Sequence, residues 1–363
     1  MKVKLGDVCK KGSSNLKQSD VIDKVGEYPV YGATGYLGSV NFYHQENPYV
    51  AVVKDGAGIG RTTLYPAKSS VIGTMQYLLP KENILPEYLC YVVRYMHLEK
   101  YFTGATIPHI YFKDYKNEKF NLDTIDRQIE IVDILTKTEN VIELHRQELE
   151  KLNNLIKARF IEMFGDPIIN PMGWKETTVG EECYYIKDGP HKSLPDVGQG
   201  NGYPFISVRN IVNGSIDFST AKYISEKDYL ESIKKCHPQK GDILYSKGGT
   251  TGIAKLVDVD IKFANWVHVA VLKFDDSMNG VFFENMLNCD YCYDQSQRLT
   301  KGIANRDLVL SAMAQIKIYK PPLKLQKEFA AFVTQVDKSK VAVQKALDEA
   351  QLLFDSLMQK YFG

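Results

Sequence analysis

Two motifs contain residue types that could carry metal or cofactor chemistry. Cys289 and Cys292 form a CxxC pair, "CDYC". Without a second pair or a well-spaced histidine, this pair is a weak indication of zinc. "GAGIG" (residues 56–60) has the glycine spacing of a dinucleotide-binding loop, but the strand-like run "RTTLY" follows where a nucleotide-binding helix should begin. We therefore expect no metal site and no cofactor bound by this chain.

A third motif, "ENPYV" (46–50), resembles the catalytic Asn-Pro-Pro-Tyr turn of adenine methyltransferases. It lacks the second proline, and no glycine-rich cofactor motif precedes it, so it reads as a turn before a strand. No GK[ST] phosphate loop is present, and neither half of the chain shows a compact acid–base or nucleophilic set of residues. The sequence predicts a non-catalytic protein.

Composition is that of a soluble protein with room for two domains. The chain has 363 residues, of which 44% are hydrophobic and 25% charged, and its formal net charge is +1. Six cysteines in a chain of this length indicate a reducing compartment rather than a disulfide scaffold. No apolar run resembles a signal peptide or reaches transmembrane length, so we expect a cytoplasmic protein.

The elements that would position any site occur twice in the sequence, as an internal repeat. At an offset of 198 residues, Gln128 falls on Gln326, Leu149 on Leu347 and Gly165 on Gly363. "KLGDVC" falls on "TVGEEC" at a smaller offset, and the glycine turn "KDGAGIG" (54–60) falls near "SKGGTTG" (246–252). Each copy starts with strand-like runs such as "YVAVVK" and "VHVAVLKF", interrupted by glycine turns and by helical stretches such as "PEYLCYVVRYMHLEKYF".

Each copy ends in a long run without proline or glycine whose apolar residues keep heptad spacing. The residues expected to pair the two helices are Leu135, Ile142, Leu149, Leu152, Ile156, Val336, Val343, Leu347, Phe354 and Leu357. We expect an α+β fold in which two mixed α/β domains are separated by two long helices packed as an antiparallel coiled coil, with a pseudo-two-fold internal repeat. The expected segments are 1–122 (first head), 123–165 (first helix), 166–322 (second head) and 323–363 (second helix). A helix of this length is about 60 Å long, so it would act as a spacer.

The duplicated plan resembles the specificity subunit of Type I DNA restriction–modification systems. The resemblance covers the whole chain and rests on the Leu/Val-Gly-Asp/Glu opening of each copy, on "DRQIEIVDIL" and "LQKEFAAFV" at the helix starts, and on the endings "MFG" and "YFG". The second copy also has "DGPHKSLPDVGQGNGYPFISVRNI", similar to the DGxH-x-P loop of the family's target-recognition domains. The first copy lacks this phrase, which suggests a different recognition subtype.

The resemblance implies a non-catalytic subunit of a bacterial or archaeal complex that reads a two-part, asymmetric sequence in double-stranded DNA. It implies docking of two methyltransferase subunits that use S-adenosylmethionine, and of restriction subunits that use ATP and magnesium where they are present. Two alternatives remain open: the specificity chain of a Type IIB/IIG-like system, and a two-headed protein scaffold that binds no DNA.

Candidate DNA contacts are polar or basic residues in glycine-marked turns, because a turn can enter a groove and a strand interior cannot. They are Tyr36, Lys54, Arg61, Thr62 and His109 in the first head, and His191, Lys192, Arg209, Asn210, Lys247, Thr250, Thr251, Lys255, Lys301, Asn305 and Arg306 in the second. The first head carries 15 basic and 11 acidic residues and the second 18 and 19. The second head therefore needs clustered basic groups or help from partners to hold DNA.

Overall fold

The chain folds into two compact units, each of which combines one head with parts of both long helices. A computed structural model describes residues 1–103, 108–212, 214–303 and 305–363. The first unit is Met1–Glu148 with Val343–Gly363, and the second unit is Leu149–Ala342. Among the described residues, no helix has the length and apolar character needed to cross a bilayer.

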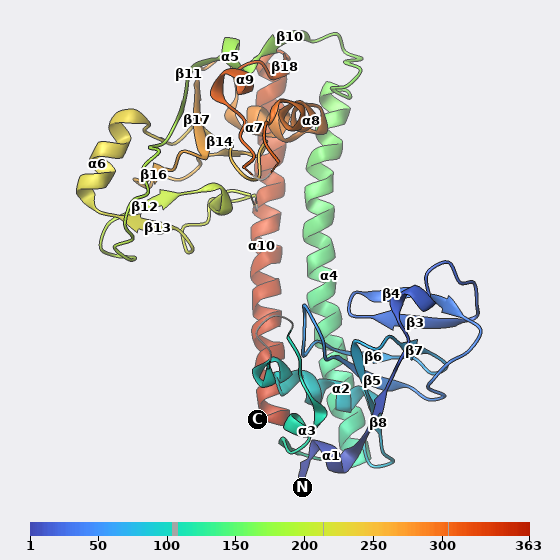
Figure 1. The fold of residues 1–363 in the computed structure, drawn as a ribbon. Helices are drawn as coiled ribbons and strands as arrows, with labels where there is room; N and C mark the ends of the chain where they lie inside the picture. The colour runs from blue at the N-terminus through green and yellow to red at the C-terminus, as the bar shows by residue number, and fades with distance from the viewer. Residues whose placement is uncertain (104–107, 213, 304) are drawn as a thin grey trace. The chain divides into compact units, whose positions relative to one another are not determined.

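The first unit holds three small sheets (Figure 1). A four-stranded antiparallel sheet has the order β2-β8-β5-β6, a three-stranded sheet has the order β4-β3-β7, and β1 pairs with β9. The elements are β1 (Lys2–Lys4), α1 (Leu5–Val8), β2 (Cys9–Ser13), η1 (Gln18–Asp20), β3 (Tyr28–Gly32), β4 (Gly35–Val40), β5 (Tyr49–Val53), β6 (Thr62–Tyr65), β7 (Ser70–Val71), β8 (Met75–Pro80), α2 (Pro86–Tyr95), η2 (Leu98–Tyr101), α3 (Phe112–Tyr115), β9 (Lys119–Asn121) and α4 (Ile125–Phe164).

The second unit repeats this plan strand for strand. Its sheets have the orders β11-β17-β14-β15, β13-β12-β16 and β10-β18. The elements are β10 (Lys175–Thr178), α5 (Val179–Glu182), β11 (Cys183–Asp188), β12 (Tyr203–Ile206), η3 (Val208–Asn210), β13 (Lys222–Ile224), α6 (Glu226–Lys235), β14 (Ile243–Ser246), β15 (Ala254–Leu256), β16 (Ala264–Asn265), β17 (Val269–Phe274), α7 (Gly280–Asn288), α8 (Asp290–Leu299), α9 (Leu310–Met313), β18 (Lys317–Lys320) and α10 (Leu323–Phe362). The predicted internal repeat is confirmed.

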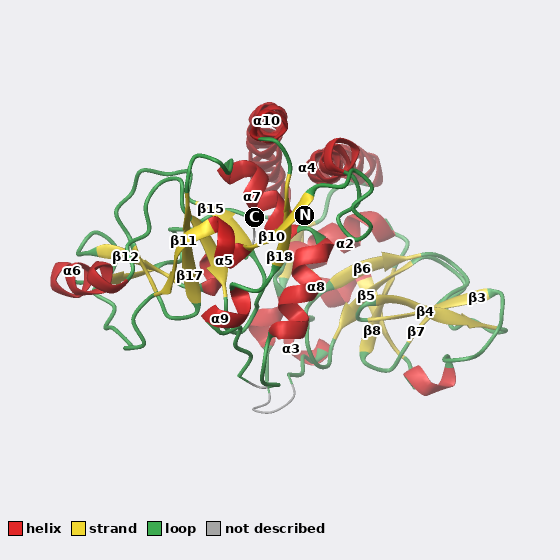
Figure 2. Ribbon diagram, turned by 90° about the horizontal axis from the view of Figure 1, so that it is seen from above, coloured by secondary structure: helices red, strands yellow, loops and turns green. Residues whose placement is uncertain are grey.

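The predicted strand runs form the central strands of the four-stranded sheets. "YVAVVK" gives β5, which is buried along its whole length, and "VHVAVLKF" gives β17. A central strand buried on both faces favours the β-branched residues that both runs contain. Helix α2 begins with Pro86 as its first residue, where proline's missing N–H costs nothing. It packs against β5 and β6 (Figure 2), so one face of this sheet is covered.

Within each unit the two long helices run antiparallel. In the first unit the Arg127 guanidinium near the start of α4 lies 5.9 Å from the ring centre of Tyr361, near the end of α10. In the second unit Phe160 near the end of α4 lies 5.5 Å, ring centre to ring centre, from Phe329 near the start of α10. Opposite ends meet in both cases, which confirms the antiparallel pairing.

The ten residues expected in the helix seam are all at least half-buried. Leu135, Ile142, Ile156 and Val336 are buried, and Leu149, Leu152, Val343, Leu347, Phe354 and Leu357 are intermediate. Aromatic residues that the heptad pattern left out complete the packing, because Phe160, Phe164 and Phe329 form one cluster with Phe282 of α7. Each compact unit includes parts of both helices, so heads and helices are not separate compact bodies.

Candidate nucleic-acid interface

In each head a glycine turn is hydrogen-bonded to a second loop, and we call the pair the two-loop edge. In the first head it consists of residues 54–61 and 103 with 108–110, and in the second of residues 247–253 and 301–303 with 305–308. In the first head the N–H of Gly56 donates to Pro108 O at 3.0 Å and the N–H of Ile110 to Lys54 O at 2.9 Å. Thr103 and His109 exchange both backbone hydrogen bonds at 2.9 Å.

The second head makes the same hydrogen bonds at equivalent residues. The N–H of Gly249 donates to Arg306 O at 3.0 Å, and the N–H of Leu308 donates to Lys247 O at 2.7 Å. Lys301 and Asp307 exchange both backbone hydrogen bonds at 2.9 Å. The equivalent positions are therefore Thr103 and Lys301, Pro108 and Arg306, His109 and Asp307, Lys54 and Lys247, and Gly56 and Gly249.

Glycine is required where the turn reverses. Gly56 has φ +85° and Gly249 has φ +70°, both in the left-handed region that other residues adopt at a cost. A Cβ at either position would meet no other atom within 4 Å. The backbone conformation, and not a close neighbour, is therefore what selects glycine here.

In the first head, polar side chains tie the edge to the β3–β4 hairpin. The Arg61 guanidinium donates to Ala33 O in the hairpin turn at 2.9 Å. Beside it, Tyr36 is 63% exposed, and its hydroxyl lies 3.0 Å from that of Ser39. Among the first-head candidates, Tyr36 and Arg61 are exposed, whereas Thr62 is buried and donates to Gly60 O.

An acid–imidazole pair joins the two loops of this edge. His109 Nδ1 lies 2.7 Å from Asp55 Oδ1, and Lys54 Nζ lies 3.4 Å from the other oxygen of the same carboxylate. Lys54 and His109 are both half-exposed, so they present donors at the surface. Asp55, which the sequence analysis missed, fixes both of them.

The second head replaces this pair with a buried ionic cluster. Lys247 is 5% exposed, and its Nζ lies 2.8 Å from Asp307 and 3.6 Å from Asp188. Lys235 Nζ also lies 2.8 Å from Asp188. Asp188 is the aspartate of the "DGPH" motif, so this motif holds the glycine turn in place through its ion pair with Lys247. Lys247 holds the edge together and presents no donor to solvent.

Two further candidates of the second head are buried, and their polar side-chain atoms are hydrogen-bonded within the domain. Asn210 is 1% exposed, accepts from Ser207 and donates to Asp217 O and Thr220. Thr251 is 1% exposed, and its hydroxyl lies 2.9 Å from that of Thr300. Both stabilise loops.

The remaining candidates differ in exposure and in whether their polar groups are already paired within the head. Lys255 pairs with Glu284 at 2.9 Å and both side chains are largely buried. Arg306 is half-buried and donates to Gln297 Oε1 and, at 3.4 Å, to Thr251 Oγ1. The exposed candidates of the second head are His191, Lys192, Arg209, Thr250, Lys301 and Asn305. Arg306 and the exposed Thr250, Lys301 and Asn305 thus form the polar rim of the second edge, whereas His191, Lys192 and Arg209 lie outside its loops.

The described residues of these edges hold no metal cluster. In the portion of the chain that the structure describes, no group of three or more His, Cys, Asp or Glu side chains is placed to hold a metal ion. The edges offer hydrogen-bond donors and acceptors on rigid loops, which is the chemistry of recognition.

Comparisons with known proteins agree with the duplicated plan. The profile of the family described as Type I restriction modification DNA specificity domain matches residues 1–154 and again residues 171–350. The Type I restriction enzyme MjaVIII specificity subunit of Methanocaldococcus jannaschii is 25% identical over 324 residues, which are 82% of this chain and 76% of that protein.

Two solved structures share the fold. The S subunit of a Type I restriction–modification system from M. genitalium matches with a TM-score of 0.63 at 16% identity, over 100% of this chain and 96% of that one. A chain from a study of complex assembly and conformational transition of the type I R-M system matches with a TM-score of 0.55 at 16% identity, over 99% and 97%. With two family matches that cover most of its length, this chain belongs to the DNA specificity subunits of Type I restriction–modification systems.

Proposed function

We propose that each head reads one half of a two-part, asymmetric DNA site through its two-loop edge. The observation that carries this proposal is that the two edges have the same backbone hydrogen bonds but different side chains. Thr103, Pro108 and His109 in the first edge stand where the second edge has Lys301, Arg306 and Asp307. One scaffold with two unlike sets of donors and acceptors recognises two unlike half-sites.

The side chains at the second edge suit the major groove. Arg306 can donate two hydrogen bonds to guanine, and Asn305 can pair with adenine. In the first edge Arg61 and His109 take the corresponding role, with Tyr36 beside them. The second head has nearly balanced charge, so its affinity for phosphates must come largely from partner subunits.

Two methyltransferase subunits dock on equivalent positions of the long helices. Leu155 on α4, in the second unit, is 47% exposed, and Leu353 on α10, in the first unit, is 53% exposed. They are 198 residues apart and therefore equivalent in the repeat. The two leucines give an apolar surface that recurs at the repeat offset, and a repeated surface fits two copies of one partner.

The chemistry belongs to these partners. The methyltransferase subunits supply S-adenosylmethionine, and restriction subunits, where they join, supply ATP and magnesium. This chain contributes recognition and assembly and carries no catalytic residue. Such a complex acts in the cytoplasm of a bacterium or archaeon, where its DNA lies.

Methylation mapping tests the proposal. The chain is produced together with the methyltransferase encoded beside its gene, in a host that lacks adenine methylation, and modified adenines in the host DNA are mapped. A single gapped, asymmetric motif that disappears when this chain is omitted is the expected result. A stable complex that methylates no motif and shows no salt-dependent DNA affinity would support the scaffold alternative instead.

A further inference from the structure

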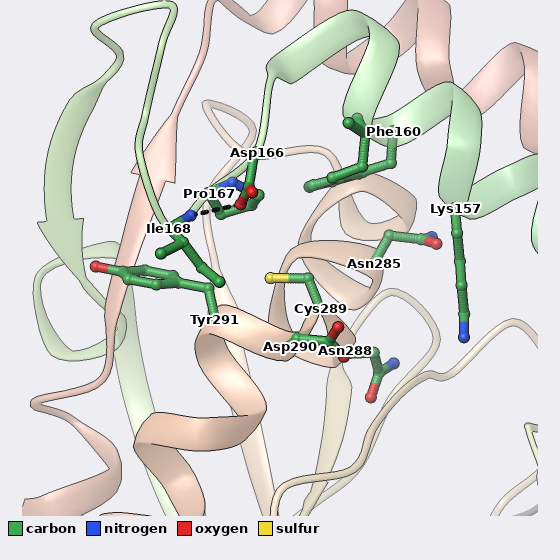
Figure 3. A pocket seen from close by; sticks show the side chains of 11 residues that line it. Lys157, Phe160, Asp166, Pro167, Ile168, Asn285, Asn288, Cys289, Asp290 and Tyr291 are labelled. Carbon is green, nitrogen blue, oxygen red and sulfur yellow. Dashed lines mark hydrogen bonds between the residues drawn. The ribbon is translucent and has the colours of Figure 1, made fainter.

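The recognition function leaves one motif unused, the CxxC pair at the start of α8. Cys289 lies between α7 and α8, where it is both the C-cap residue of α7 and the N-cap residue of α8. Its side chain lines a cavity of about 280 Å³ formed by the end of α4, the turn after it, and the α7–α8 junction. Figure 3 shows its sulfur directed toward Ile168 and the ring of Tyr291.

The two thiols of the pair differ in their surroundings. Cys289 reaches the cavity, and the neighbouring Cys292 side chain, followed by the first backbone N–H groups of α8, lowers the pKa of its thiol against the opposing effect of burial. The Cys292 thiol itself donates to Lys317 O at 3.5 Å. Cys292 is fully buried behind it, and burial raises the pKa of its thiol. An accessible thiolate beside a buried thiol is the arrangement of an attacking and a resolving cysteine.

The other four cysteines have thiols of low reactivity. All are buried, and burial raises the thiol pKa of Cys9 and Cys183 to about 12 and that of Cys90 and Cys236 to about 11. Cys289 is therefore the one cysteine whose surroundings favour the thiolate. The cavity is lined by Lys157 and also by the carboxylates of Asp166 and Asp290, so a neutral disulfide is the suitable probe.

We propose that Cys289 and Cys292 form a reactive dithiol site that exchanges with low-molecular-weight disulfides and closes into an intrachain disulfide. The Cys289 thiolate attacks one sulfur of the small disulfide, forming a mixed disulfide and releasing one small thiolate. That thiolate takes the proton of Cys292, whose sulfur then attacks Cys289 and releases the second small thiolate. The two cysteines are oxidised by two electrons, and the small disulfide is reduced to two thiols.

The site lies on the helix that supports the second recognition edge. Gln297, near the end of α8, donates to Thr251 O at 2.9 Å and accepts from Arg306. Ser296, in the last turn of α8, packs close to Gly252 in the glycine turn. The dithiol and the edge are thus at opposite ends of one ten-residue helix.

Peptide mapping of the full chain tests the dithiol. The folded protein is treated with 2-hydroxyethyl disulfide, acid-quenched, and digested for mass spectrometry. The peptide with both cysteines should lose the mass of two hydrogen atoms, while the other four cysteines stay reduced. Cys292→Ser should stop at the mixed disulfide, with one hydroxyethylthio group on Cys289. Cys289→Ser should leave Cys292 unmodified.

Alkylation rates give a second readout that needs no variant. With iodoacetamide at pH 7, Cys289 should react at least about tenfold faster than any other cysteine in the folded chain, because its thiolate fraction is larger. In guanidinium chloride the six rates should converge. A folded protein whose Cys289 reacts no faster than Cys9 or Cys236, or whose pair stays reduced while another cysteine is modified, overturns the proposal.

Discussion

Gln128 and Gln326 perform the same task in the two units. Each is fully buried near the start of a long helix. Gln128 Oε1 accepts from the N–H of Leu85, which caps α2, at 2.9 Å, and Gln326 Oε1 accepts from the N–H of Asn279, which caps α7, at 2.8 Å. The side-chain amides donate back to main-chain carbonyls, to Asp123 O at 2.9 Å and to Pro321 O at 2.8 Å. Each glutamine thus joins a head to its helix.

Replacing either glutamine should loosen one unit. Gln128→Leu removes the buried partner of the N–H of Leu85 and of the carbonyls of Asn83 and Asp123, at a cost of about 1–3 kcal/mol in the free energy of unfolding. Urea denaturation of the full chain measures this. Gln147→Leu is the control, because Gln147 is exposed on the same helix and its side-chain amide donates to the exposed Glu143. Equal effects of the two changes would contradict the assigned role.

Substitutions at two adjacent residues of α4 test folding and docking separately. Ile156 is 7% exposed in the core of the second unit, whereas Leu155 is 47% exposed. Ile156→Asp buries an unpaired charge and should destabilise the unit by about 3–5 kcal/mol. Leu155→Asp should leave the thermal unfolding temperature unchanged and weaken methyltransferase binding.

Native mass spectrometry of the complex measures the docking part. Leu155→Asp and Leu353→Asp should each reduce the bound methyltransferase from two copies to one, and the double variant should bind none. A complex that keeps both copies in the double variant would place the docking surface elsewhere.

A chain shortened to residues 1–165 should dimerise. The first unit takes Met358 and Phe362 of α10 into its core, and the shortened chain lacks both. Phe160 and Phe164 are their equivalents at the 198-residue offset, so a second copy can supply them to the vacant place. Analytical ultracentrifugation should report a dimer. With methyltransferase present, this dimer should direct methylation of a palindromic form of the first half-site. A well-folded monomer would show that α10 is dispensable.

The buried Lys247 should matter for the second half-site only. Lys247→Met removes the cation that Asp188 and Asp307 share and leaves Lys235 to pair with Asp188, so Asp307 is no longer held and the second edge should lose its conformation. DNA competition assays should show lost discrimination in the second half-site and full discrimination in the first. Lys240→Met, at an exposed lysine just before β14, is the matched control and should leave both unchanged.

The sequence predicted features that depend on local patterns. The repeat, the long helices, and strands β5 and β17 follow from periodicity and from the 198-residue offset. It did not predict the break after α2, where His97 adopts φ +50° and one helical stretch becomes two. This break depends on how the following segment packs, which periodicity does not encode.

For the candidate contacts, too, the sequence predicted local features and missed interactions between distant residues. Glycine spacing located both turns, and the structure joins each turn to a second loop. Burial of Lys247 and Thr251 depends on partners far along the chain: Asp188 precedes Lys247 by 59 positions, and Thr300 follows Thr251 by 49. Nothing in the residues next to each candidate reveals such a partner.

The most direct test of the account is methylation mapping with one variant in each edge. The unmodified chain should give one gapped motif with two unlike parts. Arg61→Ala should change the bases accepted in one part only, and Arg306→Ala should change those in the other part only. If both variants alter the same part, or neither alters the motif while the protein stays folded, the two-loop edges do not read the DNA.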